Sequence, residues 1–175
     1  MDELVATMHQ VWDGKLRGAS GPMPALEPRR PGLLFGGFAP ASFARAATVG
    51  QGWIAPSFGH QALVDGIASI RAAWERVGRA DRPRVVVERY FCFGEDTHET
   101  ARHYLDHYYV DGTDVLADAP TTREHLDAEL RRIRDAGADD VILLPCADGP
   151  EQVIMLAETL DGLGVPAGPT GRELR

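Results

Sequence analysis

Residues 31–53 read PGLLFGGFAPASFARAATVGQGW, and this stretch decides the fold. The apolar run at residues 32–35 predicts a short buried strand, and Gly36-Gly37 predicts a tight turn directly after it. Pro40 suits the first turn of a helix, because the N–H that it lacks would have no partner there. A second short strand is expected at residues 52–56. The stretch therefore predicts a strand, a helix and the next strand in close succession.

The rest of the sequence repeats this alternation. Apolar residues at helical spacing predict helices at residues 4–12, 63–77, 96–109, 121–137 and 150–160, and β-rich runs predict strands at 84–93 and 140–145. Asp96 with Glu99 and Thr121 with Glu124 resemble capping boxes at two of the helix starts. The segments between these elements are a Gly- and Pro-rich loop at 14–31, a polar connector at 111–120 and a loosely ordered tail at 161–175.

One helix followed by four strand–helix units predicts an α/β protein whose parallel sheet is covered by helices. A doubly wound sheet and part of a (β/α)8 barrel both satisfy this order. The period of the apolar residues does not distinguish between them.

Composition excludes several classes of function. The chain has 175 residues, which fits one domain, and a formal net charge of −8 from 26 acidic and 18 basic residues. Because it has no long basic run, nucleic acid is not an expected partner. No apolar run reaches the length of a membrane span, and the first residues lack the pattern of a signal peptide. The two cysteines, Cys92 and Cys146, are not in a metal-binding spacing. A disulfide stays possible, but a reduced cytoplasmic protein is the simpler interpretation.

Residues 31–53 also resemble the bacterial luciferase-like monooxygenase family. In that family an apolar strand ends in Gly-Gly, a helix with small residues follows, and a turn such as Asp-Gly-Trp leads into the next strand. Here Gln51 stands in place of the usual Asp before Gly52-Trp53. The long helix that ends at Gly78-Arg79 and the strand within residues 137–144 follow in the family's order. The resemblance covers roughly residues 2–160.

The resemblance implies a partial (β/α)8 barrel, made of about four parallel βα units that correspond to strands five to eight. Residues 1–175 would then be a single luciferase-like domain that is truncated on its amino-terminal side, since a whole barrel takes about 250 residues. Four strands leave two open sheet edges. A homo-oligomer, a partner chain that covers the edges or an open, flattened sheet would each solve this problem.

A candidate cofactor site follows from the turn. Glycines let backbone N–H groups approach a phosphate, and a helix amino terminus adds a favourable dipole. The resemblance implies that the phosphate of FMN or coenzyme F420 lies near this turn, and that Phe38, Ala39 and Ser42 join Gly36 and Gly37 there. Ser57 follows the second strand at the edge where barrels build their active sites. The alternatives are a turn selected for close packing and a loop serine that caps the next helix.

Other polar residues suggest structural roles. His98, His103 and His107 share one expected helix, but they lack an HExxH pattern and a third ligand, so no metal site is expected. Alternation places Glu88, Tyr90 and Cys92 on one face of a strand and Arg89 with Phe91 on the other. Glu88 or Arg89 is expected to guard an exposed face or edge rather than to serve catalysis. No catalytic residue is identified.

Two functions fit these features. The first is a luciferase-like flavin- or F420-dependent oxidoreductase or monooxygenase acting on a small-molecule substrate, in which the cofactor performs the redox chemistry. The second is a non-catalytic binding or structural half-barrel derived from that family, with or without a partner chain. The absence of half of the barrel motivates the second.

Overall fold

The computed structural model describes residues 1–15, 30–110 and 113–165. Along the chain the elements are α1 (Asp2–Trp12), β1 (Leu34–Gly36), α2 (Pro40–Val49), β2 (Gly52–Ala55), α3 (His60–Arg76), β3 (Arg84–Phe91), α4 (Thr97–Tyr108), α5 (Thr113–Ala117), α6 (Arg123–Ala136), β4 (Asp140–Pro145) and α7 (Glu151–Leu163). Most of the loop expected at residues 14–31 and most of the tail expected at 161–175 lie outside the described residues.

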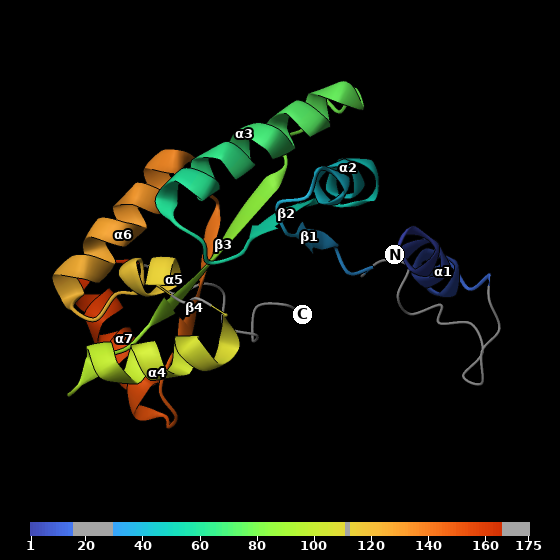
Figure 1. Ribbon diagram of the computed structural model, residues 1–175. Coiled ribbons are helices and arrows are strands. Elements are labelled where there is room, and N and C mark those ends of the chain that lie inside the picture. The colour runs from blue at the N-terminus through green and yellow to red at the C-terminus, as the bar shows by residue number, and fades with distance from the viewer. Residues whose placement is uncertain (16–29, 111–112, 166–175) are drawn as a thin grey trace.

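The four strands form one parallel sheet in the order β1-β2-β3-β4. Each new strand is added on the same side of the one before it, as Figure 1 shows. A doubly wound sheet would instead reverse its strand order near the middle. The order therefore decides between the two architectures that the sequence left open, and the expected half-barrel of four parallel βα units is confirmed.

One face of the sheet is covered by helices. Trp53 and Ala55 from β2 and Val85 and Val87 from β3 pack in one buried cluster with residues of α2, α3 and α6. Helix α3 approaches β2 very closely at Gly66, where an added Cβ atom would lie 2.2 Å from the Trp53 ring. Glycine at this position is what allows the helix to lie so near the strand.

The opposite face is only partly covered. Tyr90 and Cys92 pack there with Ala101 and Leu105 of α4, near the carboxyl end of β3. The two faces of β3 are thus the ones that alternation predicts. Farther along this face, the Ile142 side chain in β4 is 41% exposed. We call the face that carries Tyr90 and Ile142 the inner face, because it corresponds to the lumen side of a barrel.

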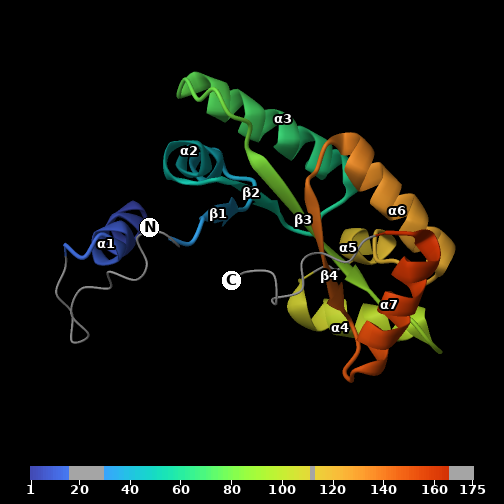
Figure 2. The same cartoon turned by 180° about the vertical axis from the view of Figure 1, so that it is seen from behind.

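The two ends of the half-barrel are far apart. Helix α1 lies beyond β1, whereas α6 and α7 lie at the other end of the sheet, as both views show (Figures 1 and 2). Within the described residues, β1 pairs only with β2 and β4 only with β3, so both sheet edges are open. No helix among the described residues has the length and apolar character of a membrane span.

Four local expectations differ from the structure. The polar connector at 111–120 contains the short helix α5. Helix α6 is capped by Thr122 rather than Thr121, since the Thr122 hydroxyl accepts a hydrogen bond from the His125 N–H at 3.1 Å. Asp96 precedes α4 in a left-handed conformation, with φ of 48°, and its side chain makes no capping bond. In addition, α7 continues to Leu163, past the expected end of the last helix at residue 160.

Candidate functional site

The Gly36-Gly37 turn follows β1 at the carboxyl edge of the sheet. Gly37 has φ of +90°, which is a conformation that residues with a side chain rarely adopt. Its carbonyl oxygen accepts a hydrogen bond from the Trp53 Nε1–H at 3.0 Å. Because the Trp53 side chain is completely buried, this bond fixes the turn to β2. The turn is therefore both conformationally special and rigidly held.

Helix α2 begins immediately after the turn, at Pro40. The Ser42 hydroxyl lies beside Gly37, since a Cβ atom added at Gly37 would be 3.5 Å from it. Ser42 N–H donates to the Ala39 carbonyl at 2.8 Å, and Pro40 has no N–H to offer. The free donors of a helix amino terminus are thus few here, and the hydroxyl of Ser42 supplements them. Phe38 and Ala39 are exposed at the mouth of the turn.

Ser57 lies just past the end of β2. Its side chain is 2% exposed, and its Oγ has no hydrogen-bond partner among the described residues. A buried hydroxyl without a partner costs folding free energy, so such groups usually face a ligand or an ordered water. The expectation that this serine caps the next helix is wrong, because α3 has no side-chain capping bond at its start.

The loops after β1 and β2 meet through their aromatic residues. The Phe38 and Phe58 rings are in an edge-to-face contact with centroids 5.8 Å apart. Ser57 is the neighbour of Phe58, so the structure brings it to the same edge of the sheet as the Gly37 turn. Two arginines that contact α2 bond elsewhere. Arg45 pairs with Asp2, and Arg79 lies at the carboxyl end of α2, away from the turn, where it donates to the Gly50 carbonyl at 2.7 Å. An anion at the turn would therefore be held by backbone and hydroxyl groups.

Two histidines of α4 lie next to each other on the helix surface. The His103 and His107 rings lie 4.4 Å apart, and His107 Nδ1 is 2.8 Å from the His103 carbonyl oxygen. Both side chains are exposed, and the described residues contain no group of three metal-binding side chains. Cys92 and Cys146 are free and buried, and burial raises the pKa of the Cys146 thiol to about 12.

Arg89 has a role that sequence reasoning missed. It does not guard an exposed face or edge, because its side chain is 0% exposed on the helix-covered face. Its Nε donates to the Glu129 carboxylate at 2.8 Å, and Glu129 is 1% exposed. A signal existed in the sequence, since Glu129 shares the apolar stripe of α6 with Leu126 and Ile133. Sequence alone does not pair two residues that are 40 positions apart.

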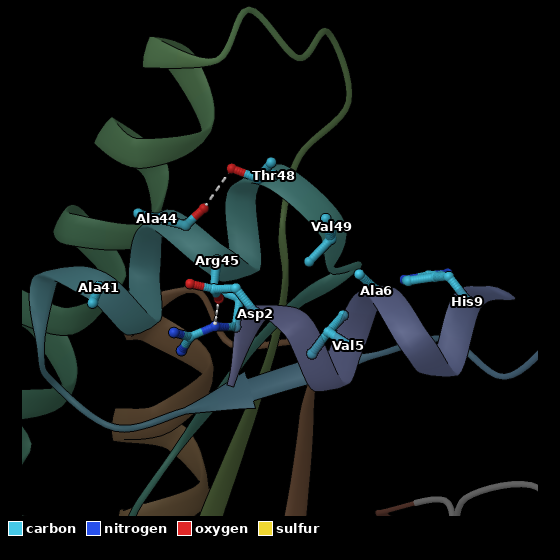
Figure 3. Close-up of a pocket in the computed structure, with 9 residues that line it drawn as sticks. All are labelled: Asp2, Val5, Ala6, His9, Ala41, Ala44, Arg45, Thr48 and Val49. Atoms are coloured by element: carbon cyan, nitrogen blue, oxygen red, sulfur yellow. Dashed lines mark hydrogen bonds and ion pairs between the residues drawn. The ribbon is translucent and has the colours of Figure 1, made fainter.

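A cavity of about 400 Å³ lies between α1 and α2. Figure 3 shows the Asp2–Arg45 ion pair among the lining residues, which also include Val5, Ala6 and Val49. None of the residues that line this cavity belongs to the turn or to the loop after β2. The cavity is therefore separate from the candidate site.

A family model described as luciferase-like monooxygenase matches residues 1–165. The chain belongs to the luciferase-like monooxygenase family. The resemblance inferred from residues 31–53 is thus confirmed. No curated protein matches the chain.

Solved structures of similar fold agree with this assignment. One is an F420-dependent secondary alcohol dehydrogenase in complex with an F420–acetone adduct, with a TM-score of 0.69 and 14% identity over 94% of this chain and 61% of that chain. Another is coenzyme F420-dependent tetrahydromethanopterin reductase from Methanopyrus kandleri, with a TM-score of 0.62 and 11% identity over 91% and 60%. A third is riboflavin lyase with modified FMN and riboflavin, with a TM-score of 0.61 and 19% identity over 98% and 60%.

This luciferase-like chain spans about 60% of the length of those structures. At such identities the similarity establishes the fold and leaves the site residues as predictions.

Proposed function

We propose that this chain is the carboxy-terminal half of a luciferase-like oxidoreductase, and that it holds the phosphate of FMN or coenzyme F420 at the Gly36-Gly37 turn. The observation that carries the proposal is the buried Ser57 hydroxyl, which lies at the same edge of the sheet as the turn and has no hydrogen-bond partner in the described part of the chain. The family supports oxidoreductase chemistry, and two solved structures of similar fold are described as F420-dependent.

The residues at the turn fit a phosphate group. Gly36 and Gly37 carry no side chain that would block its approach, and the Ser42 hydroxyl lies beside Gly37. The buried Ser57 hydroxyl has no hydrogen-bond partner among the described residues. Phe38 and Ala39 contribute backbone N–H groups at the start of α2, where the helix dipole favours an anion. The cofactor would supply the electrons or hydride for the reaction. The chain's own residues would bind it, orient it and keep it against the carboxyl edge of the sheet.

The proposal is tested by measuring FMN and F420 binding to the wild-type chain and to Gly37→Glu by isothermal titration calorimetry. The new carboxylate would occupy the phosphate position and repel it, so we expect a loss of affinity of at least about tenfold, equivalent to about 1.4 kcal/mol. Gly78→Glu is the matched control. Gly78 also has a positive φ, of +74°, but lies after α3, between that helix and β3, with open space around its Cβ position.

Equal FMN affinities for Gly37→Glu and Gly78→Glu would show that the turn is not the phosphate site. Failure of the wild-type chain to bind either cofactor at high micromolar concentration would contradict the proposal as a whole. It would favour the second function, a non-catalytic half-barrel that retains the fold without the cofactor.

The open barrel supports a further part of the proposal. As far as the described residues go, β1 and β4 each have one unpaired edge, and the inner face is partly exposed, so a second copy or a partner chain would complete the sheet. Sedimentation velocity over a range of concentrations tests this, and a soluble monomer at every concentration would count against self-association. The free, buried cysteines support a reduced, cytoplasmic setting.

A further inference from the structure

A continuous band of aromatic rings crosses the carboxyl edge of the sheet. It starts at Phe38 in the candidate cofactor turn and reaches Phe58 after β2, with ring centroids 5.8 Å apart. Phe58 contacts Tyr109 at 5.8 Å, and Tyr109 contacts Tyr90 of β3 at 6.1 Å. Tyr90 in turn contacts two residues of α4, Tyr104 at 5.8 Å and Tyr108 at 6.5 Å. We call these six residues the aromatic band.

The contacts within the band fix the orientation of its rings. Phe38, Phe58, Tyr109 and Tyr90 meet edge to face, with interplanar angles of 82° to 88°. This is a favourable geometry for aromatic pairs, and it leaves ring faces available to a further ring. Because the rings come from four separate segments, a ligand that touches the band would contact a surface that is already formed.

Four of the six side chains in the band are exposed to solvent. Phe38 is 36% exposed, Phe58 41%, Tyr104 39% and Tyr108 69%, whereas Tyr90 at the centre is 6% exposed. Apolar side chains that gather on a surface in this way commonly mark a binding site. The band begins in the turn itself, so its position is continuous with the proposed cofactor site.

Two hydroxyl groups lie at the centre of the band. The Tyr109 and Tyr90 oxygens are 3.4 Å apart, a long hydrogen bond in which Tyr109 donates. Burial is the main cause that raises the pKa of Tyr90, so its phenol stays neutral and retains its proton. The centre of the band therefore offers a hydrogen-bonded hydroxyl pair within an apolar surface, which matches a hydroxyl or carbonyl group on a flat ring.

We propose that the aromatic band binds the organic substrate, and that this substrate is a planar aromatic molecule carrying a hydroxyl or carbonyl group. The inference rests on the proposed function, because the band is placed beside the cofactor turn. An aliphatic chain would gain burial from the same surface but would neither stack on the rings nor use the hydroxyl pair. Planarity and one polar group are the features that the band recognises.

The experiment titrates the full chain with 2-naphthol, followed by the fluorescence of the naphthol, and with 1-octanol as an aliphatic competitor. Phe58→Ala removes the exposed ring that connects the two halves of the band, and Tyr109→Phe removes one hydroxyl while keeping the ring. We expect each variant to weaken 2-naphthol binding about 3- to 10-fold, the range of one aromatic contact or one hydrogen bond. Val153→Ala is the control, since Val153 is 59% exposed on α7 outside the band.

Unchanged 2-naphthol affinity in Phe58→Ala, or octanol displacing naphthol at equal concentration, would overturn the inference. So would the absence of 2-naphthol binding to the wild-type chain. Titration of the same preparations with FMN and with F420 separates this from the proposed function. Cofactor binding without naphthol binding rejects the substrate class alone, whereas absence of binding of both cofactors rejects the cofactor site. Circular dichroism of each variant confirms that the chain is folded in every comparison.

Discussion

Replacing Glu129 with methionine should destabilise the fold more than the same replacement of Arg89, although the two residues form one ion pair. Both side chains are buried, and the Arg89 Nε lies 2.8 Å from the Glu129 carboxylate. Glu129 has a second partner in Arg132, whose Nη1 is 3.0 Å from its other oxygen. Among the described residues, the other hydrogen bond of Arg89 runs from its Nη1 to the Glu88 carbonyl, at 2.9 Å, and its Nη2 has no partner.

The magnitudes follow from what each substitution leaves behind. Glu129→Met leaves the Arg89 guanidinium buried without its direct counter-charge, which should cost about 3–5 kcal/mol. Arg89→Met leaves a carboxylate still paired with Arg132, a residue whose side chain is 47% exposed and can follow it toward water. We therefore expect a smaller loss, about 1–3 kcal/mol. The double substitution removes both charges from the interior and should lie within about 1 kcal/mol of the wild type.

Urea unfolding followed by tryptophan fluorescence measures all four proteins. With a slope of about 2 kcal/mol/M, a loss of 4 kcal/mol lowers the midpoint by about 2 M urea. The reasoning is refuted if Arg89→Met is the more destabilising single variant. It is also refuted if the double variant loses the sum of the two single losses, since that would mean that the two charges do not interact.

Three further predictions concern other buried positions. The Gln152 side chain donates to the Phe93 carbonyl at 2.7 Å and accepts from the Phe93 N–H at 2.9 Å. Gln152→Ala leaves both backbone groups without a partner and should lower the free energy of unfolding by about 2–4 kcal/mol. Urea unfolding measures this loss, and a value under about 1 kcal/mol would contradict the prediction. Gly66→Ala places a Cβ atom 2.2 Å from the Trp53 ring and should cost about 1–3 kcal/mol. A melting temperature equal to that of the wild type would contradict this. Burial raises the pKa of Asp118, so its contribution to stability is full below about pH 4 and is lost as pH rises through the folded-state pKa. We therefore expect Asp118→Asn to be more stable than the wild type in urea unfolding at pH 8 but not at pH 4. A stability gain that is the same at both pH values would contradict this prediction.

The elements that sequence predicts well are those defined by local pattern. Strand β4 has the expected bounds, and the strand after Pro31 ends at the expected glycine turn. The errors lie where local signals compete. Thr121 and Thr122 are equally good caps, and only the hydrogen bond to His125 selects the second. Helix α5 has five residues, which is too short to show a clear period.

The long-range features could not be read from the sequence. A period of apolar residues describes one element at a time, so the strand order that separates a barrel from a doubly wound sheet becomes visible only when the strands are paired. The Gly37 turn could be predicted because glycine readily adopts the positive φ that such a turn requires. The unpartnered state of the Ser57 hydroxyl and the alignment of Phe58 with Tyr109 depend on packing between segments that are distant in the chain.

The two faces of the sheet differ in how complete they are, and this difference connects ligand binding to association. The helix-covered face is fully packed within this chain, since Trp53 and Arg89 are both 0% exposed there. The inner face is not fully covered, because Ile142 is 41% exposed and the aromatic band ends at exposed rings. We expect that a segment covering the inner face would also form the opposite wall of the proposed cofactor site. By linkage, cofactor and partner must then strengthen each other's binding by the same factor. Cofactor affinity that rises with protein concentration would reveal this coupling, and equal affinity in monomer and assembly would show that the turn works alone.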